Sequence, residues 1–300
     1  MLDKPKQADP DELAGLFIEV TDDLSYARTR YPRSQTPKYL NQLAARVHLA
    51  IYRNKKEGWA EIKKFWTNDA PAAIRGLLFP QLFWAGVVFV MAVAVGALSS
   101  ARDDGFVRLV LGDAYVEMTL RNIREGNPTG VYQHDDAWEM FLFIAFNNLR
   151  VAFLMFAAGL SAGILTFYLL LYNGVMVGTF FYLFWEYGAG SRAWPVIMIH
   201  GTMELFSICV AGGAGFALAR GILMPGTYKR LEALRLEAQK ALTVAMAAVP
   251  FILVAALLES FVTRHADMPL ALNYLIVLTS AAACVGYFVL FPLLRFPAKR

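Results

Sequence analysis

His200 and Glu204 stand four residues apart inside a long apolar stretch, and their side-chain types are suited to chemistry. Residues four apart project from the same face of a helix. An acidic or basic side chain at the centre of a membrane helix costs roughly 2.5–3.5 kcal/mol by insertion scales, so it usually faces a partner or a water-filled cavity. The pair therefore marks a candidate functional site within a membrane.

Further polar residues interrupt apolar segments at similar depths: Asn147, Asn148, Arg150, Asn173 and Glu259. With a rise of about 1.5 Å per residue, Arg150 lies about 16 Å and Glu204 about 14 Å from the outer membrane boundary. His200 and Glu259 lie closer to it, at about 8 Å and about 5 Å. Because helical side chains tilt toward the N-terminus of their helix, Arg150 leans toward Glu204 and Glu259 leans toward His200.

Two interpretations of this polar cluster remain open. An ion pair between Arg150 and Glu204, with asparagines satisfying the remaining hydrogen bonds, would lock the helices together. Alternatively, the cluster lines an outward-facing cavity that binds an ion, a proton or a polar headgroup. A dry, fully paired cluster would favour the lock, and a water-accessible cavity would favour binding.

Catalytic and cofactor chemistry have little support in the sequence. We expect no metal, because the apolar segments contain no further His, and Cys209 and Cys284 within them are expected to act as small hydrophobic residues and not as ligands. The other histidines, His48, His134 and His265, lie outside those segments. Phosphate-binding loops, zinc-protease motifs and nucleophile elbows are absent from the sequence, so we expect no cofactor and no enzyme activity.

The elements that position the cluster are membrane spans, each of which needs about 20 mostly apolar residues. Six segments qualify: 77–99, 139–158, 164–185, 195–219, 241–262 and 271–295. The apolar fraction of 57% and the mean hydropathy of +0.44 exceed those of soluble domains. We therefore predict an all-α, polytopic membrane bundle over residues 77–300, preceded by a helical region over residues 1–76.

Charge distribution predicts the orientation. Residues 220–240 carry five Lys or Arg against two Glu, whereas residues 100–138 carry four Arg against seven acids. The first segment should be a cytoplasmic loop and the second an external loop. With six spans, both termini are expected in the cytoplasm of a bacterium, and the protein in its inner membrane. No signal peptide opens the sequence.

Local patterns refine this plan. Residues 1–76 should form cytoplasmic amphipathic helices that begin at Asp9-Pro10 and Thr36-Pro37, followed by an elbow near Pro80. Residues 106–123 should form one amphipathic helix over the external mouth. Small residues permit close helix packing at Gly159, Gly163, Gly174, Gly178, Gly212, Gly213 and Gly215, and the GxxxG spacing is a weak signal of a dimer.

Five groups of residues together resemble the stage II sporulation protein M family of integral membrane proteins. They are Asn147-Asn148-Arg150 with Gly159, Asn173-Gly174 with Gly178, His200-Gly201 with Glu204, Ala211-Gly212 through Gly215 with Pro225-Gly226, and Glu259-Ser260-Phe261. The resemblance covers about residues 140–295. It implies a multi-span protein of cell-envelope remodelling without cleaving activity of its own. It also implies envelope partner proteins, and relatives are often encoded beside a MoxR-type ATPase.

These observations predict a non-enzymatic integral membrane protein, an envelope-organising scaffold of the stage II sporulation protein M type. The alternative is a transporter or channel built around the intramembrane Arg, His and Glu residues. We expect contact with the lipid bilayer and a homo-oligomer, with a dimer favoured. The net charge of +4 is too small and too dispersed to predict nucleic-acid binding.

Overall fold

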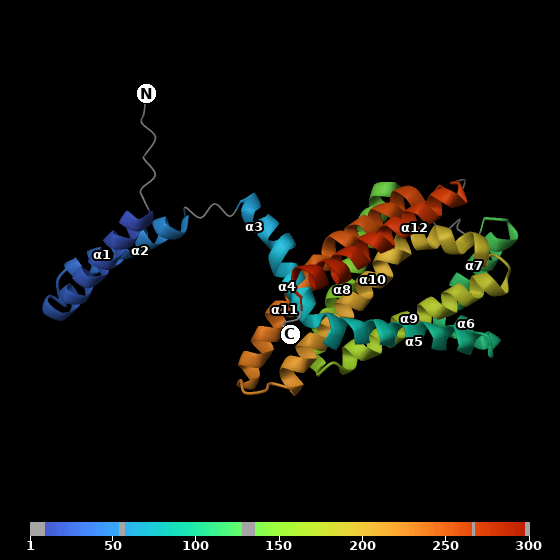
Figure 1. Cartoon of the computed structure of the whole chain (residues 1–300), viewed down its shortest axis with the longest axis horizontal. Coiled ribbons are helices and arrows are strands. Elements are labelled where there is room, and N and C mark those ends of the chain that lie inside the picture. The colour runs from blue at the N-terminus through green and yellow to red at the C-terminus, as the bar shows by residue number, and fades with distance from the viewer. Residues whose placement is uncertain (1–9, 54–57, 128–135, 266–267, 298–300) are drawn as a thin grey trace, which may run out of the picture. The chain divides into compact units, whose positions relative to one another are not determined.

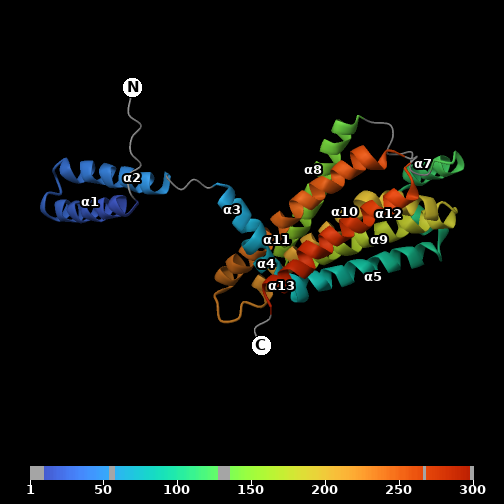
Figure 2. The ribbon, with the colours of Figure 1, turned by 45° about the horizontal axis from the view of Figure 1, so that its top comes forward.

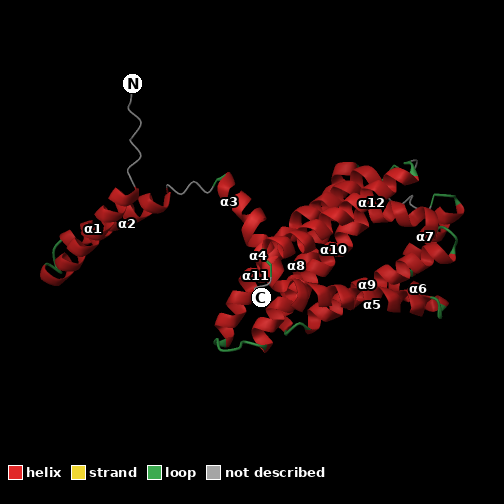
Figure 3. Cartoon of the chain, in the orientation of Figure 1, coloured by secondary structure: helices red, strands yellow, loops and turns green. Residues whose placement is uncertain are grey.

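The computed structural model describes residues 10–53, 58–127, 136–265 and 268–297. The regular elements in these ranges are helices, and no strand occurs among them (Figure 3). The predicted all-α fold is therefore confirmed. Predictions that involve Asp9, His134, Asp135, Lys299 or Arg300 fall outside the described residues.

The chain divides into two compact units, Met1–Lys63 and Lys64–Arg300. In the first unit, α1 (Pro10–Arg30) and α2 (Thr36–Arg53) pack against each other as an antiparallel hairpin (Figure 1). The hairpin is held by ring contact between Phe17 and His48 and by a 3.0 Å hydrogen bond from Arg28 to Asn41.

The second unit contains the membrane-spanning helices. After α3 (Trp59–Lys64), its elements are η1 (Phe65–Asp69), α4 (Ala70–Leu77), η2 (Leu78–Leu82), α5 (Phe83–Ser100), α6 (Asp104–Leu111), α7 (Asp113–Arg124), α8 (Ala137–Ala157), η4 (Ala158–Ser161), α9 (Ile164–Glu186), α10 (Gly190–Leu223), α11 (Arg230–Leu257), η5 (Leu258–Thr263), α12 (Leu270–Val285), η6 (Gly286–Leu290) and α13 (Phe291–Arg295). Six helical stretches in the described residues are long and apolar enough to cross a bilayer, which confirms the predicted six spans.

Helix α10 is the centre of this bundle. It contacts α5, α8, α9, α11 and α12, and it contributes more buried residues than any other described helix. Helix α5 lies alongside α9 in both views of the ribbon (Figures 1 and 2). Helices α10 and α11 extend into the segment 220–240, so their connection is shorter than the predicted loop.

Glycines allow these helices to approach within backbone contact. A Cβ on Gly178 would overlap the carbonyl oxygen of Val93, and one on Gly159 would overlap that of Gly215. Similar overlaps inside the chain would arise at Gly163, Gly174, Gly212, Gly213 and Gly215. The glycine faces are thus filled by other helices of the same chain.

The structure corrects one prediction about the external segment. Residues 106–123 do not form a single helix, because α6 ends at Leu111 and α7 begins at Asp113, with Gly112 between them. Gly112 has φ +83°, a left-handed conformation that breaks a right-handed helix and that glycine adopts at low cost. Arg108 bridges the break with ion pairs to Asp113 and Glu117, at 3.0 and 2.6 Å.

Close approach of α5 and α9 predicts opposite effects for two glycine substitutions. Gly178→Ala should lower stability by about 1–3 kcal/mol, because the new methyl group overpacks the interface with Val93. Gly86→Ala, which meets no atom within 4 Å, should be neutral or slightly stabilising because alanine favours the helix. Thermal unfolding in detergent measures both. Equal melting temperatures for the two variants would contradict the described α5–α9 contact.

Candidate functional site

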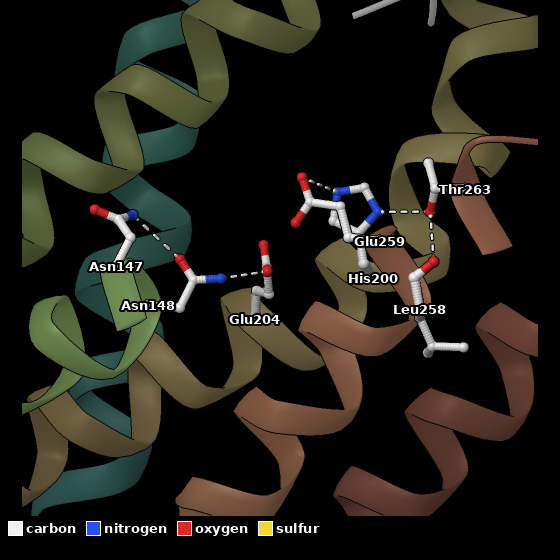
Figure 4. Close-up of polar contacts among 7 residues, drawn as sticks. All are labelled: Asn147, Asn148, His200, Glu204, Leu258, Glu259 and Thr263. Atoms are coloured by element: carbon white, nitrogen blue, oxygen red, sulfur yellow. Dashed lines mark hydrogen bonds and ion pairs between the residues drawn. The ribbon is translucent and has the colours of Figure 1, made fainter. Parts of the chain in front are cut away.

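Three ionisable side chains converge inside the bundle. His200 and Glu204 project one helical turn apart from α10, and Glu259 projects from η5 at the end of α11 (Figure 4). One ligand-type atom of each side chain, a ring nitrogen of His200 and one carboxylate oxygen of each glutamate, lies within 4.8 Å of the other two. His200 is only 4% exposed, and both glutamates are partly buried. We call these three residues the His–Glu–Glu cluster.

Thr263 fixes the orientation of the His200 ring. Its hydroxyl donates to the carbonyl oxygen of Leu258 at 3.2 Å, so its oxygen is left to accept a hydrogen bond. The Nδ1–H of His200 donates to that oxygen at 3.0 Å. The other ring nitrogen, Nε2, then carries the lone pair, and it lies 3.8 Å from Oε1 of Glu259 (Figure 4).

The π-helical turn η5 explains how Glu259 and Thr263 reach the same imidazole. A π-helical turn carries one residue more per hydrogen-bonded ring than the α-helix, and such turns are frequent at functional sites. Both residues belong to η5, and each contacts one nitrogen of His200. The widened turn therefore presents a carboxylate and a hydroxyl to one side chain of α10.

Asparagines on α8 hold the second glutamate. Nδ2 of Asn148 donates a short hydrogen bond to Oε1 of Glu204, and Nδ2 of Asn147 donates to Oδ1 of Asn148 at 3.5 Å (Figure 4). A carboxylate buried away from water needs such donors, because an unsatisfied buried polar group is costly. Helix α8 thus fixes the orientation of Glu204 from the side opposite Glu259.

A cavity of about 540 Å³ adjoins the cluster. Its polar lining consists mainly of His200, Glu204, Glu259, Asn147, Asn148 and Asn173, whereas most of its wall is apolar or aromatic, for example Tyr172, Phe180 and Met198. Val110, Leu111 and Tyr115 reach it from α6 and α7. Burial raises the pKa of the Tyr115 phenol, so it remains neutral and able to donate a hydrogen bond. Among the described residues that line the cavity, none is Lys or Arg.

Arg150 does not join the cluster, and the predicted ion pair with Glu204 is wrong. Its side chain is exposed, it does not line the cavity, and no ion pair to Glu204 is formed. The reason is helical geometry: positions two residues apart point about 200° apart around the axis, so Asn148 and Arg150 occupy opposite faces of α8. The two residues were predicted to pair because they lie at similar depths in the membrane. Similar depth does not place two side chains on facing sides of their helices.

The other predicted residues have distinct positions. Asn173 lines the cavity, although its side-chain amide donates to the carbonyl oxygen of Leu169 in its own helix at 2.8 Å. Asn147 is exposed and lines the cavity beside Asn148. Thr263 and Tyr115 were not among the predicted site residues. The four-residue spacing from Glu259 was an available signal for Thr263, whereas no local pattern indicated Tyr115.

These contacts predict different consequences for two neighbours on α8. Asn148→Ala removes a donor from a partly buried carboxylate and should destabilise the protein by about 1–3 kcal/mol. Arg150→Gln removes an exposed side chain and should change stability by no more than about 0.5 kcal/mol. Unfolding in detergent measures both. If Arg150→Gln lowered the free energy of unfolding by several kcal/mol, the result would contradict an exposed Arg150 and support a buried ion pair with Glu204.

Comparison with known proteins gave two matches, both to family models. The model of the Stage II sporulation protein M family matches residues 85–264, a range that contains the whole cluster and Asn147, Asn148 and Asn173. A second match, over residues 1–53, is to a domain of unknown function (DUF8413) and covers α1 and α2. No curated protein and no solved structure matched the chain. The multi-pass membrane chain described above belongs to the stage II sporulation protein M family.

Proposed function

We propose that this protein is a non-enzymatic transport protein whose intramembrane cavity receives a positively charged solute. One observation supports the proposal above all others: the His–Glu–Glu cluster lines a cavity of about 540 Å³. A purely structural lock would have enclosed these groups in tight packing. Ionisable residues that face a cavity within a membrane commonly mark a solute or ion pathway.

The charge of the lining indicates a cationic solute. Two carboxyl groups lie at the cavity wall, and the described lining contains no Lys or Arg to neutralise them. Rings of acidic side chains select cations in membrane pores for the same electrostatic reason. The apolar remainder of the wall lowers the local dielectric constant, which strengthens the attraction.

The arrangement gives little support to hydrolytic catalysis. Thr263 contacts His200 and is the hydroxyl best placed to act as a nucleophile. However, it is 1% exposed, donates to a backbone carbonyl and does not line the cavity. A substrate in the cavity would not reach its oxygen, so Thr263 serves to orient the imidazole.

We propose that the protein lies in the bacterial inner membrane with both termini in the cytoplasm. The support is the distribution of charge, with basic residues concentrated in 220–240 and acidic residues in 100–138. In this orientation α6 and α7 lie on the external side, and the cavity that they help to line faces the outer half of the bilayer.

An envelope-organising scaffold is the second candidate function. The separate N-terminal hairpin of α1 and α2 favours it, because this unit could dock a partner protein independently of the bundle. We propose other envelope proteins and a MoxR-type ATPase as partners on the family resemblance. We also propose a homo-oligomer, with a dimer favoured, for which the GxxxG spacing is a weak signal. A scaffold would not require water in the cavity.

Cysteine accessibility distinguishes the two functions. Met198 lines the cavity, whereas Leu278 is 66% exposed on the apolar surface of α12, and each lies eight residues from the start of its helix. In a chain with Cys209 and Cys284 replaced by Ala, Met198→Cys should react at least about tenfold faster than Leu278→Cys with a charged thiosulfonate reagent in nanodiscs, since only the thiolate in water reacts. Equally slow reaction at both positions would contradict a water-filled cavity.

A further inference from the structure

We infer that His200, Glu204 and Glu259 together form a binding site for a divalent transition-metal ion. The inference deepens the proposed function, because it names the class of cation that the cavity would receive. It rests on that function in one respect: the ion must reach the cluster through the cavity. The third ligand is the carboxylate of Glu259, whereas the expectation of no metal considered only His and Cys as third ligands.

The distances suit a metal site after a small contraction. Donor atoms around a tetrahedral zinc ion lie roughly 3.3 Å apart, because each metal–ligand bond is about 2.0–2.2 Å long. Nε2 of His200 lies 3.8 Å from Oε1 of Glu259, and all three donors fall within 4.8 Å of one another. Rotation of the two glutamate side chains would close the remaining gap without moving the helices.

The residues around the cluster orient its donors. Metal-binding histidines usually donate their second ring N–H to another group, which directs the free lone pair at the ion. Thr263 accepts from Nδ1 of His200 in this way, so that Nε2 faces the carboxylates. Asn148 holds one oxygen of Glu204 by a hydrogen bond. Both outer contacts come from elements other than α10, and they fix the donors from opposite sides.

Charge and donor type specify the class of ion. Two carboxylates carry two negative charges when ionised, and a divalent cation neutralises them inside an apolar wall. One imidazole with two carboxylates is a donor set for Zn²⁺, Mn²⁺, Fe²⁺ or Co²⁺. Mg²⁺ and Ca²⁺ prefer sites made of oxygen alone, and Cu⁺ prefers sulfur ligands. The remaining coordination positions face the cavity, where water or a solute atom could occupy them.

Direct binding measurements test the site. The full chain, purified without a histidine tag, reconstituted in nanodiscs and stripped with a chelator, should bind one Zn²⁺ or Mn²⁺ per chain in equilibrium dialysis. Ca²⁺ and Mg²⁺ should bind at least about a hundredfold more weakly. Glu259→Gln and His200→Gln should each weaken Zn²⁺ binding by a factor of at least about ten. No saturable binding to the wild type would overturn the inference.

Two controls keep the result specific. Glu139→Gln on α8 and His265→Gln change the same residue types at exposed positions and should leave Zn²⁺ binding unchanged. If the cluster variants fail to fold, X-ray absorption of the wild-type zinc complex still decides the question. It should show nitrogen and oxygen ligands with imidazole scattering, and a sulfur shell would overturn the assignment.

Uptake measurements separate this inference from the proposed function. In proteoliposomes that enclose a metal-sensitive dye, added Mn²⁺ should quench the dye faster with wild type than with Glu259→Gln. Stoichiometric binding without uptake would support the metal site and contradict transport. Rapid thiol modification at Met198→Cys without any metal binding would support the cavity and overturn the metal site.

Discussion

Two glutamates and a histidine meet within a membrane-spanning bundle, and the need to satisfy these groups away from bulk water governs the rest of the structure. Two of the three side chains are held by other elements: Thr263 of η5 orients His200, and Asn148 of α8 holds Glu204. These contacts require α8, α10 and the end of α11 to meet at one level. Helix α10 carries two members of the cluster and contacts every other spanning helix, so the site and the fold share one centre.

The spans and the cluster members could be predicted because both depend on local properties of the sequence. A run of about 20 apolar residues has few alternatives to crossing a bilayer, and helical rise converts sequence position into depth. Depths estimated from helical rise correctly predicted that His200, Glu204 and Glu259 lie at neighbouring levels. The depth estimate did not predict the position of Arg150, because depth carries no information about direction around the helix axis. Arg150 lies on the face of α8 opposite Asn148.

Other features depend on long-range packing and could not be predicted from local patterns. The break between α6 and α7 follows from the positive φ of Gly112, although the flanking residues have a continuous amphipathic pattern. The cavity exists because α8, α9 and α10 are held together by glycine contacts and polar bonds elsewhere along their length. A cavity depends on how several helices pack together, so no local sequence pattern predicts it.

The proposed transport function and the metal site both require that the cavity remains open beside the two carboxyl groups in a lipid environment. The most direct measurement is a cryo-electron microscopy map of the full chain in lipid nanodiscs, at a resolution that shows ordered water. We expect an open volume among α8, α9 and α10, with density for water or solute against Glu204 and Glu259. A bundle in which apolar side chains fill that volume and surround both carboxyl groups would contradict it.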